Sequence, residues 1–202
     1  NHRIRKIATD GSVSTLAGTS TASIVNGSVA VARFNEPCGI AVDAAGNAYV
    51  TENVSNAIRK VEPTGTTSVY AGSVSSAGSS NGPILTAQFT SPKGLYFSAE
   101  GQLLVADTGN HLVRVISASG LVSTFAGTDD DDTVNGNGDE AAFSQPCGVV
   151  SSAAGDVYVS QIGNSLIRKI VSLQNMVPVP GTFLGTTALP VTLAVTGLPP
   201  AD

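Results

Sequence analysis

One pattern recurs along the chain with a period of 54 or 55 residues, and it constrains the fold more than any other feature. Arg5, Arg59, Arg114 and Arg168 keep this spacing, and each follows Ile or Val. The same period carries an Ala-Gly pair, a Pro-x-Gly motif and a Phe, at Gly18, Gly72 and Gly127, at Pro37, Pro92 and Pro146, and at Phe34, Phe89 and Phe143. An internal repeat of this length indicates that one supersecondary unit is used several times.

Each period contains four short apolar segments that are separated by Gly, Asn and Ser. One copy has them at residues 39–42, 48–50, 57–61 and 67–71, and the next copy has them at 94–97, 103–105, 112–116 and 121–126. Segments of this length between turn residues are typical of β-strands. Only 12% of the residues are charged, whereas 22 are Gly and 10 are Pro, which disfavours exposed helices. The sequence therefore predicts an all-β fold, a β-propeller built from four-stranded blades.

The motif around the third arginine resembles the NHL repeat. Residues 110–112 read Asn-His-Leu, the tripeptide that names this family, and residues 1–3 read Asn-His-Arg, a close variant. Residues 55–57 and 164–166 depart from the tripeptide, as Ser-Asn-Ala and Asn-Ser-Leu. Together with the Pro-x-Gly and Ala-Gly motifs, the resemblance covers residues 1–171. It implies a disc-shaped propeller, most often with six blades around a central channel.

The period divides the chain into an NHL-repeat propeller segment, residues 1–181, and a tail, residues 182–202. We expect a partial first blade at 1–18 and further blades at about 27–72, 81–127 and 135–181, the last with its outer strand at 177–180. The tail is rich in Pro and Thr, and we interpret it as a linker or the start of a further β segment. A shortened further blade and a closing strand pair for the first blade are the alternatives. Three and a half to four blades do not close an ordinary ring, so we expect part of a six-bladed ring, either a fragment of a longer chain or half of an assembly.

Charge and hydropathy narrow the choice of partner. The net charge is −5, from ten Lys or Arg against fifteen Asp or Glu, so a basic surface for nucleic acid is not expected. No apolar run reaches the length of a membrane-spanning helix. Two glycosylation sequons, at Asn26 and Asn53, together with the acidic, Lys-poor composition, favour a secreted or cell-surface glycoprotein.

Polar residues that recur in every blade are expected to serve the blade, because chemistry needs one convergent site per molecule. We therefore interpret Arg5, Arg59, Arg114 and Arg168 as structural repeat residues that pair with strand carbonyls or nearby carboxylates. The same argument applies to two equivalent pairs, His2 with His111 and Cys38 with Cys147. Two blades separate the members of each pair, which disfavours a metal site and a disulfide.

The carboxylates offer no better candidate. Asp129–Asp132, with Asp139 and Glu140, form the main acidic cluster, but this loop lacks the ligand spacing of a calcium-binding EF-hand. We interpret it as a solvated loop. Asp43 follows an inner strand and is expected to cap its own turn.

Two functional hypotheses follow. The first is a non-enzymatic extracellular scaffold whose propeller loops bind a protein or a glycan. The alternative is part of a propeller enzyme, similar to amidating lyases or lactonases, whose active site lies outside this segment. We predict no catalytic, cofactor-binding or metal-binding residue, and no cofactor, within the sequence itself.

Overall fold

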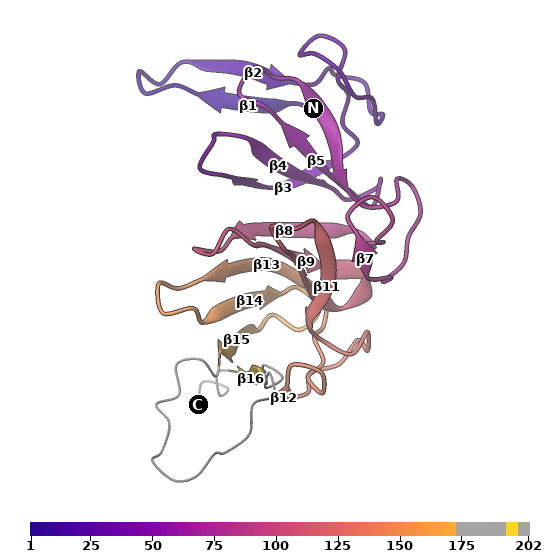
Figure 1. Ribbon diagram of the computed structural model, residues 1–202, viewed down its shortest axis with the longest axis vertical. Coiled ribbons are helices and arrows are strands. Elements are labelled where there is room, and N and C mark those ends of the chain that lie inside the picture. Colours follow the sequence, from indigo (N-terminus) through magenta and orange to yellow (C-terminus); the bar gives the residue numbers. More distant parts are fainter. Residues whose placement is uncertain (173–192, 198–202) are drawn as a thin grey trace.

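The computed structural model describes residues 1–172 and 193–197 and is built from antiparallel sheets stacked one after another (Figure 1). The first sheet has two strands, β1 (Ile4–Ile7) and β2 (Val13–Ala17). The second is a four-stranded blade, β3 (Pro37–Val42), β4 (Ala48–Glu52), β5 (Ala57–Val61) and β6 (Thr67–Ala71). The predicted all-β fold with four-stranded propeller blades is therefore confirmed.

Two further blades each carry a short additional strand at the outer edge. One contains β8 (Pro92–Phe97), β9 (Leu103–Asp107), β10 (Leu112–Ile116) and β11 (Leu121–Ala126), with β7 (Gly82–Pro83) beside β11. The other contains β13 (Pro146–Ser151), β14 (Val157–Gln161), β15 (Ile167–Ser172) and β16 (Leu193–Gly197), with β12 (Gly136–Asn137) beside β16. A short 3₁₀ helix, η1 (Thr108–Asn110), follows β9. The sequence did not predict β7, β12 or η1.

Strand β16 lies inside residues 182–202, which the sequence analysis interpreted as a linker or the start of a further β segment. Residues 168–172 of β15 pair antiparallel with residues 193–197, so β16 is the fourth strand of the last blade. The expected outer strand at 177–180 lies outside the described residues. In the three other sheets a one-residue register shift occurs beside the recurring arginine, between Ile4/Arg5, Ile58/Arg59 and Val113/Arg114.

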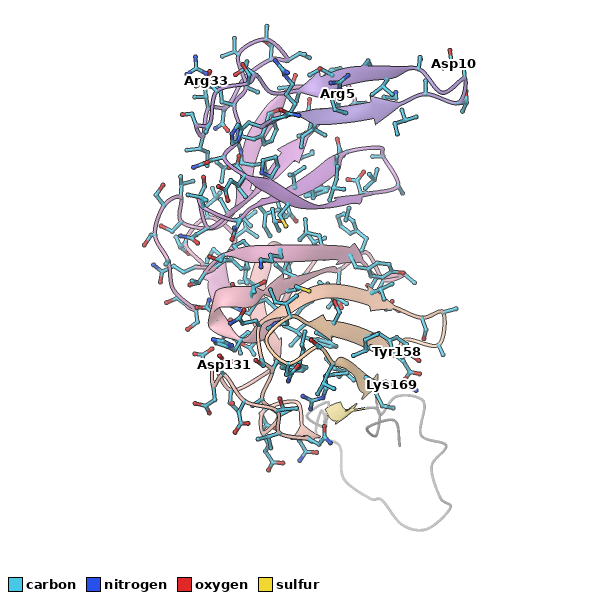
Figure 2. All side chains as sticks on the ribbon, turned by 180° about the vertical axis from the view of Figure 1, so that it is seen from behind. Arg5, Asp10, Arg33, Asp131, Tyr158 and Lys169 are labelled. Carbon is cyan, nitrogen blue, oxygen red and sulfur yellow. The ribbon has the colours of Figure 1, made fainter. Side chains whose placement is uncertain are left out.

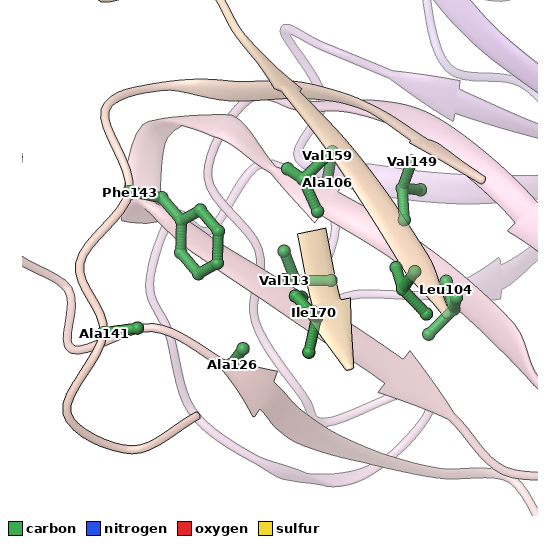
Figure 3. Packing of buried hydrophobic residues seen from close by; sticks show 10 residues of the cluster. Leu104, Ala106, Val113, Ala126, Ala141, Phe143, Val149, Val159 and Ile170 are labelled. Atoms are coloured by element: carbon green, nitrogen blue, oxygen red, sulfur yellow. The ribbon is translucent and has the colours of Figure 1, made fainter. Parts of the chain in front are cut away.

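The hydrophobic core lies between consecutive blades. Inner strand β8 lies beside both β3 and β13, so each blade packs against its neighbours in the chain. Figure 3 shows one such interface, where Leu104 and Ala106 of β9 pack against Val149 and Val159 of the next blade. The equivalent interface one blade earlier contains Tyr49, which also makes edge-on contacts with two aromatic rings. In the described part of the chain, no helix is long and apolar enough to span a bilayer.

Candidate functional site

Three of the four recurring arginines are completely buried at one end of the blades. Arg59, Arg114 and Arg168 have no exposed surface, although each carries a full charge at neutral pH. Burying a guanidinium costs free energy unless its N–H groups are hydrogen-bonded. The residues around each of these arginines must therefore supply hydrogen-bond acceptors.

Each buried arginine binds two backbone carbonyls of the long loop that precedes its blade. Arg59 donates from Nη2 to the Val25 oxygen at 2.9 Å and from Nη1 to the Arg33 oxygen at 3.1 Å. The equivalent carbonyls are Ser80 and Gln88 for Arg114, and Val134 and Ala142 for Arg168. One side chain thus fastens the loop at two points that lie eight residues apart.

An Asn side chain completes the anchor on the loop side. Nη2 of Arg59 donates to Oδ1 of Asn26 at 2.9 Å, and the same bond recurs from Arg114 to Asn81 at 2.7 Å and from Arg168 to Asn135 at 2.6 Å. Each of these Asn residues precedes a Gly. The sequence analysis missed this set, although the Asn-Gly pairs keep the period of the arginines.

On the blade side, each guanidinium meets an acid or amide seven residues earlier in the chain. These partners are Glu52 at 3.2 Å, Asp107 at 2.9 Å and Gln161 at 3.4 Å. A Phe ring lies 5.2 to 5.4 Å from each guanidinium carbon, within cation–π range, at Phe34, Phe89 and Phe143. Two blades therefore bury an ion pair, and the third buries an arginine beside a neutral amide.

Burial raises the pKa values of two acids at these sites. Desolvation raises the pKa of Asp107 to about 6, although hydrogen bonds from the Thr90 N–H and from Asn110, together with the Arg114 charge, oppose the shift. Desolvation also raises the pKa of Glu52, against the opposing charge of Arg59. Both carboxyls lie in contact with a recurring arginine, whose charge opposes the shift, and burial within the blade accounts for the raised pKa values.

The anchored segments are the three long loops that join the blades, residues 18–36, 72–91 and 127–145, named here the long loops. They lie at one end of the strands, together with the turns that join β4 to β5, β9 to β10 and β14 to β15, and the other hairpin turns lie at the opposite end (Figure 1). Figure 2 shows Arg33 and Asp131 at the long-loop end and Asp10 at the hairpin end. Away from the anchor points the long loops differ in sequence, so a common frame carries three different surfaces.

The tripeptide position joins neighbouring blades. His2, Asn56, His111 and Ser165 share a left-handed backbone, with φ between 48° and 59°. Nδ1 of His111 accepts the N–H of Gln145 at 3.4 Å, and Oδ1 of Asn56 accepts the N–H of Ser91 at 2.8 Å. These N–H groups each belong to the residue before the recurring Pro of the next blade. The tripeptide thus links each blade to the loop that enters the next one.

The acidic cluster is exposed on the third long loop, residues 127–145. Several of its carboxylates bind neighbouring polar groups. Oδ1 of Asp131 accepts from the Ser144 hydroxyl at 2.6 Å and lies 3.4 Å from Nδ1 of His111. Oδ2 of Asp129 accepts from Ser79 of the preceding long loop at 3.2 Å. These contacts connect two long loops into one surface.

The other residues considered in the sequence analysis are not part of the arginine sites. Cys38 and Cys147 are free thiols. Asp43 accepts the N–H groups of Ala45 and Asn47 and so caps its own turn. Over residues 1–172 and 193–197, no three His, Cys, Asp or Glu side chains group as metal ligands.

The glycosylation candidates differ in their surroundings. Asn26 is exposed, and it uses its Oδ1 for Arg59, which leaves Nδ2, the atom that carries an N-linked glycan, outside that bond. Asn53 is half-buried, and its Oδ1 has no hydrogen-bond partner in the described residues. Ser55, the third residue of the Asn53 sequon, is 3% exposed.

The fourth recurring arginine is different. Arg5 is exposed and, within the described residues, donates one hydrogen bond, from Nε to the Ser14 oxygen at 3.2 Å. Arg5 lies at the equivalent position of β1, as the interpretation as a repeat residue requires. In the described residues it does not make the contacts that the buried arginines make.

The stacked blades and their buried arginines define the chain as a β-propeller segment. A family model described as "NHL repeat" matches residues 89–116 of this chain. A curated relative, Protein SUPPRESSOR OF QUENCHING 1, chloroplastic, from Arabidopsis thaliana, is 32% identical over 83 residues, which are 41% of this chain and 8% of the plant protein.

Solved propellers show the same fold at low sequence identity. A protein of unknown function from Bacteroides thetaiotaomicron superposes with a TM-score of 0.72 at 20% identity, over 84% of this chain and 42% of that one. An auxiliary nutrient binding protein from the same organism gives 0.65 at 20% identity, over 83% and 42%. A catalytically inactive virginiamycin B lyase from Staphylococcus aureus, solved with quinupristin, gives 0.53 at 16% identity, over 83% and 45%. The chain thus spans less than half the length of these proteins.

Proposed function

We propose that the chain is a non-enzymatic binding scaffold, outside the cell or at its surface, whose long-loop end binds a protein or glycan partner. The observation that carries the proposal is the arginine anchor, which fastens each long loop at two carbonyls and one Asn side chain. Loops fixed at their bases lose little conformational entropy on binding, and variable loops on a rigid frame are a common arrangement for recognition.

The fold alone does not choose between binding and catalysis. The propellers of similar shape include one named as an auxiliary nutrient binding protein and one named as a lyase. The hydrogen bonds of the buried charged residues support binding over catalysis. Glu52, Asp107 and the three arginines are the buried charged residues of the described part, and each one bonds to its own blade or loop.

The charge of the long-loop end favours a partner that is not anionic. Asp129–Asp132, Asp139 and Glu140 are exposed on one long loop, and the whole chain carries a net charge of −5. Such a surface attracts cationic groups and repels phosphates, and the attraction is screened by salt. We therefore expect a basic protein surface or a neutral or cationic glycan, and no nucleic acid.

The test compares the two ends of the blades with charge-matched variants. One variant carries Asp129→Ser, Asp130→Ser and Asp132→Ser at the long-loop end and leaves Asp131, which binds Ser144, unchanged. The control carries Asp10→Ser, Glu62→Gln and Glu100→Gln, which are exposed in hairpin turns at the opposite end. The probes are a printed panel of neutral, cationic and anionic glycans and a Lys-rich peptide.

Saturable binding of a neutral or cationic probe that the first variant loses and the control keeps supports the proposal. Equal loss in both variants would show a nonspecific charge effect, and binding of no probe would overturn it. Inductively coupled plasma mass spectrometry measures bound metal. A stoichiometric metal ion retained by the intact protein would instead support the enzymatic alternative.

A further inference from the structure

His111 places one ring nitrogen between a hydrogen-bond donor and an acceptor. Nδ1 lies 3.4 Å from the backbone nitrogen of Gln145 and 3.4 Å from Oδ1 of Asp131. A ring nitrogen accepts a hydrogen bond only when it carries no proton, and it donates one only when it carries a proton. The two contacts therefore belong to two different protonation states of the same side chain.

The neutral state makes the link between blades. Nδ1 then accepts the Gln145 N–H, as Oδ1 of Asn56 accepts the Ser91 N–H at the equivalent position. An Asn side chain does not titrate, so its link is independent of pH. When His111 is protonated, both ring nitrogens carry hydrogen, so the Gln145 N–H loses its acceptor and the ring donates to Asp131.

The segment that receives this link is held by several contacts. The φ angle of Gln145 is 48°, in the left-handed region, where a non-glycine residue needs surrounding contacts to keep it. Its oxygen accepts the Ile162 N–H at 3.1 Å. Three residues earlier, the Ala142 carbonyl binds the buried Arg168. Loss of the Gln145 N–H bond therefore loosens the end of the third long loop next to its arginine anchor.

Asp131 is placed to receive the protonated ring. Its side chain is 51% exposed at the long-loop end (Figure 2), whereas that of His111 is 18% exposed. Oδ1 also accepts the Ser144 hydroxyl at 2.6 Å, and this bond keeps the carboxylate beside the ring. A carboxylate and an imidazolium in contact attract each other, so the protonated state replaces the lost backbone bond with an ion pair.

Other charges near the ring come from two places in the described part of the chain. Asp129–Asp132 lie together on the third long loop, and the buried pair of Asp107 and Arg114 lies on the His111 side. The second long loop, strand β13 and the turn after β14 contain no Asp, Glu, Lys, Arg or His, and Cys147 is their one titratable residue. Asp107 also titrates near neutral pH, because burial raises its pKa to about 6.

We propose that His111 is a pH-sensitive switch in the third long loop, in which protonation exchanges the bond from the Gln145 N–H for an ion pair with Asp131 and loosens the segment that enters β13. Histidine is the side chain whose charge ordinarily changes between about pH 5 and 8. The exchange also adds a positive charge to the acidic surface, so we expect it to weaken the binding of a cationic partner. Only this last consequence rests on the function proposed above.

The test follows single amide groups of the free chain by NMR measurement of exchange with water, corrected for the intrinsic dependence of exchange on pH. From about pH 7.5 to about pH 5, we expect the protection of the Gln145 amide to fall about fivefold, the effect of one lost hydrogen bond. The Ser91 amide, which Asn56 holds, is the internal control and is expected to keep its protection.

Two variants assign the change to one side chain. His111→Asn gives this position the residue found at position 56, and Asn readily adopts the left-handed backbone that His111 has, with φ of 59°. We expect this variant to keep the Gln145 amide protected at both pH values. Asp107→Asn removes the other group that titrates nearby and is expected to leave the loss of protection in place.

Four results of the exchange measurement would overturn the switch. These are unchanged Gln145 protection in the wild type, an equal loss in His111→Asn, an equal loss at Ser91, and a loss that Asp107→Asn abolishes.

Binding of a Lys-rich peptide is measured separately. We expect the wild type to bind it about threefold more weakly at the lower pH, and His111→Asn to bind it equally at both. Equal binding by the wild type at both pH values would overturn the effect on the partner. No binding at either pH would contradict the proposed function alone, because the exchange measurement needs no partner.

Discussion

At the scale of single residues, the buried pair of Asp107 and Arg114 shows why the recurring arginines cannot be exchanged freely. Arg114→Ala leaves the Asp107 carboxylate buried without its cation, and we expect a loss of about 3–5 kcal/mol in the free energy of unfolding. Urea denaturation measures the loss. Arg5→Ala, at the exposed equivalent position, is the control and is expected to change stability by less than about 0.5 kcal/mol. Equal losses in both variants would contradict a role for burial.

The raised pKa of Asp107 predicts an unusual dependence of stability on pH. Because this carboxyl has a pKa of about 6 in the folded chain and a lower value when unfolded, the folded state binds the extra proton. Its contribution to stability is therefore complete below about pH 4 and is lost as the pH rises through about 6, by up to about 3 kcal/mol.

The comparison with Asp107→Asn isolates this effect, because the variant has no proton to bind at that position. Between pH 7 and pH 4 we expect the wild type to gain stability relative to the variant in urea denaturation. A wild type that instead loses stability relative to the variant over this range would show that Arg114 holds the carboxyl in its charged form.

At the scale of the elements, the close contact of adjacent inner strands requires Gly at the Pro-x-Gly motif. A Cβ added to Gly39 of β3 would lie 2.0 Å from the Lys93 carbonyl oxygen of β8, which is backbone and cannot move aside. We expect Gly39→Ala to lower the free energy of unfolding by about 2 kcal/mol or more. Gly136→Ala is the control, since its nearest atom is the Glu140 Cβ at 3.3 Å. Matching urea midpoints for the two variants would rule out this steric explanation.

The elements also show what the sequence could predict. Thirteen of the strands follow from apolar segments that recur with the arginine period, because each repeats the same turn and core positions. Strand β16 did not follow from the period. The third and fourth strands are joined by short turns in the other blades, at 8–12, 62–66 and 117–120, whereas β15 ends at Ser172 and β16 begins at Leu193.

The candidate site was only partly predictable for a related reason. The arginines recur in sequence and were identified as structural, but their loop partners are carbonyls, which carry no sequence signature. The Asn partners, Asn26, Asn81 and Asn135, do recur, and their spacing from the arginines was a usable signal.

At the scale of the whole molecule, contacts between neighbouring blades hold the structure together. Thr51 of one blade donates to the Lys93 oxygen of the next at 2.6 Å, and Thr108 donates to the Pro146 oxygen at 2.6 Å. These bonds join the same pairs of sheets as the hydrophobic clusters and the tripeptide links. Each blade is therefore held mainly by its two neighbours, as in other repeat architectures, and the loop surface stays rigid only while adjacent blades remain packed.

The proposed extracellular location predicts that the chain is N-glycosylated when it is secreted. Expressed with a secretion signal in mammalian cells, the chain is expected to carry a glycan on Asn26, because this side chain is exposed and its bond to Arg59 uses Oδ1 and not Nδ2. Mass spectrometry before and after removal of N-glycans measures it. Ser28→Ala abolishes the sequon while keeping Asn26 on Arg59, so it should remove the glycan without lowering stability. Asn26→Ala would remove both the glycan and the hydrogen bond to Arg59, and a secreted chain without a glycan at Asn26 would contradict the prediction.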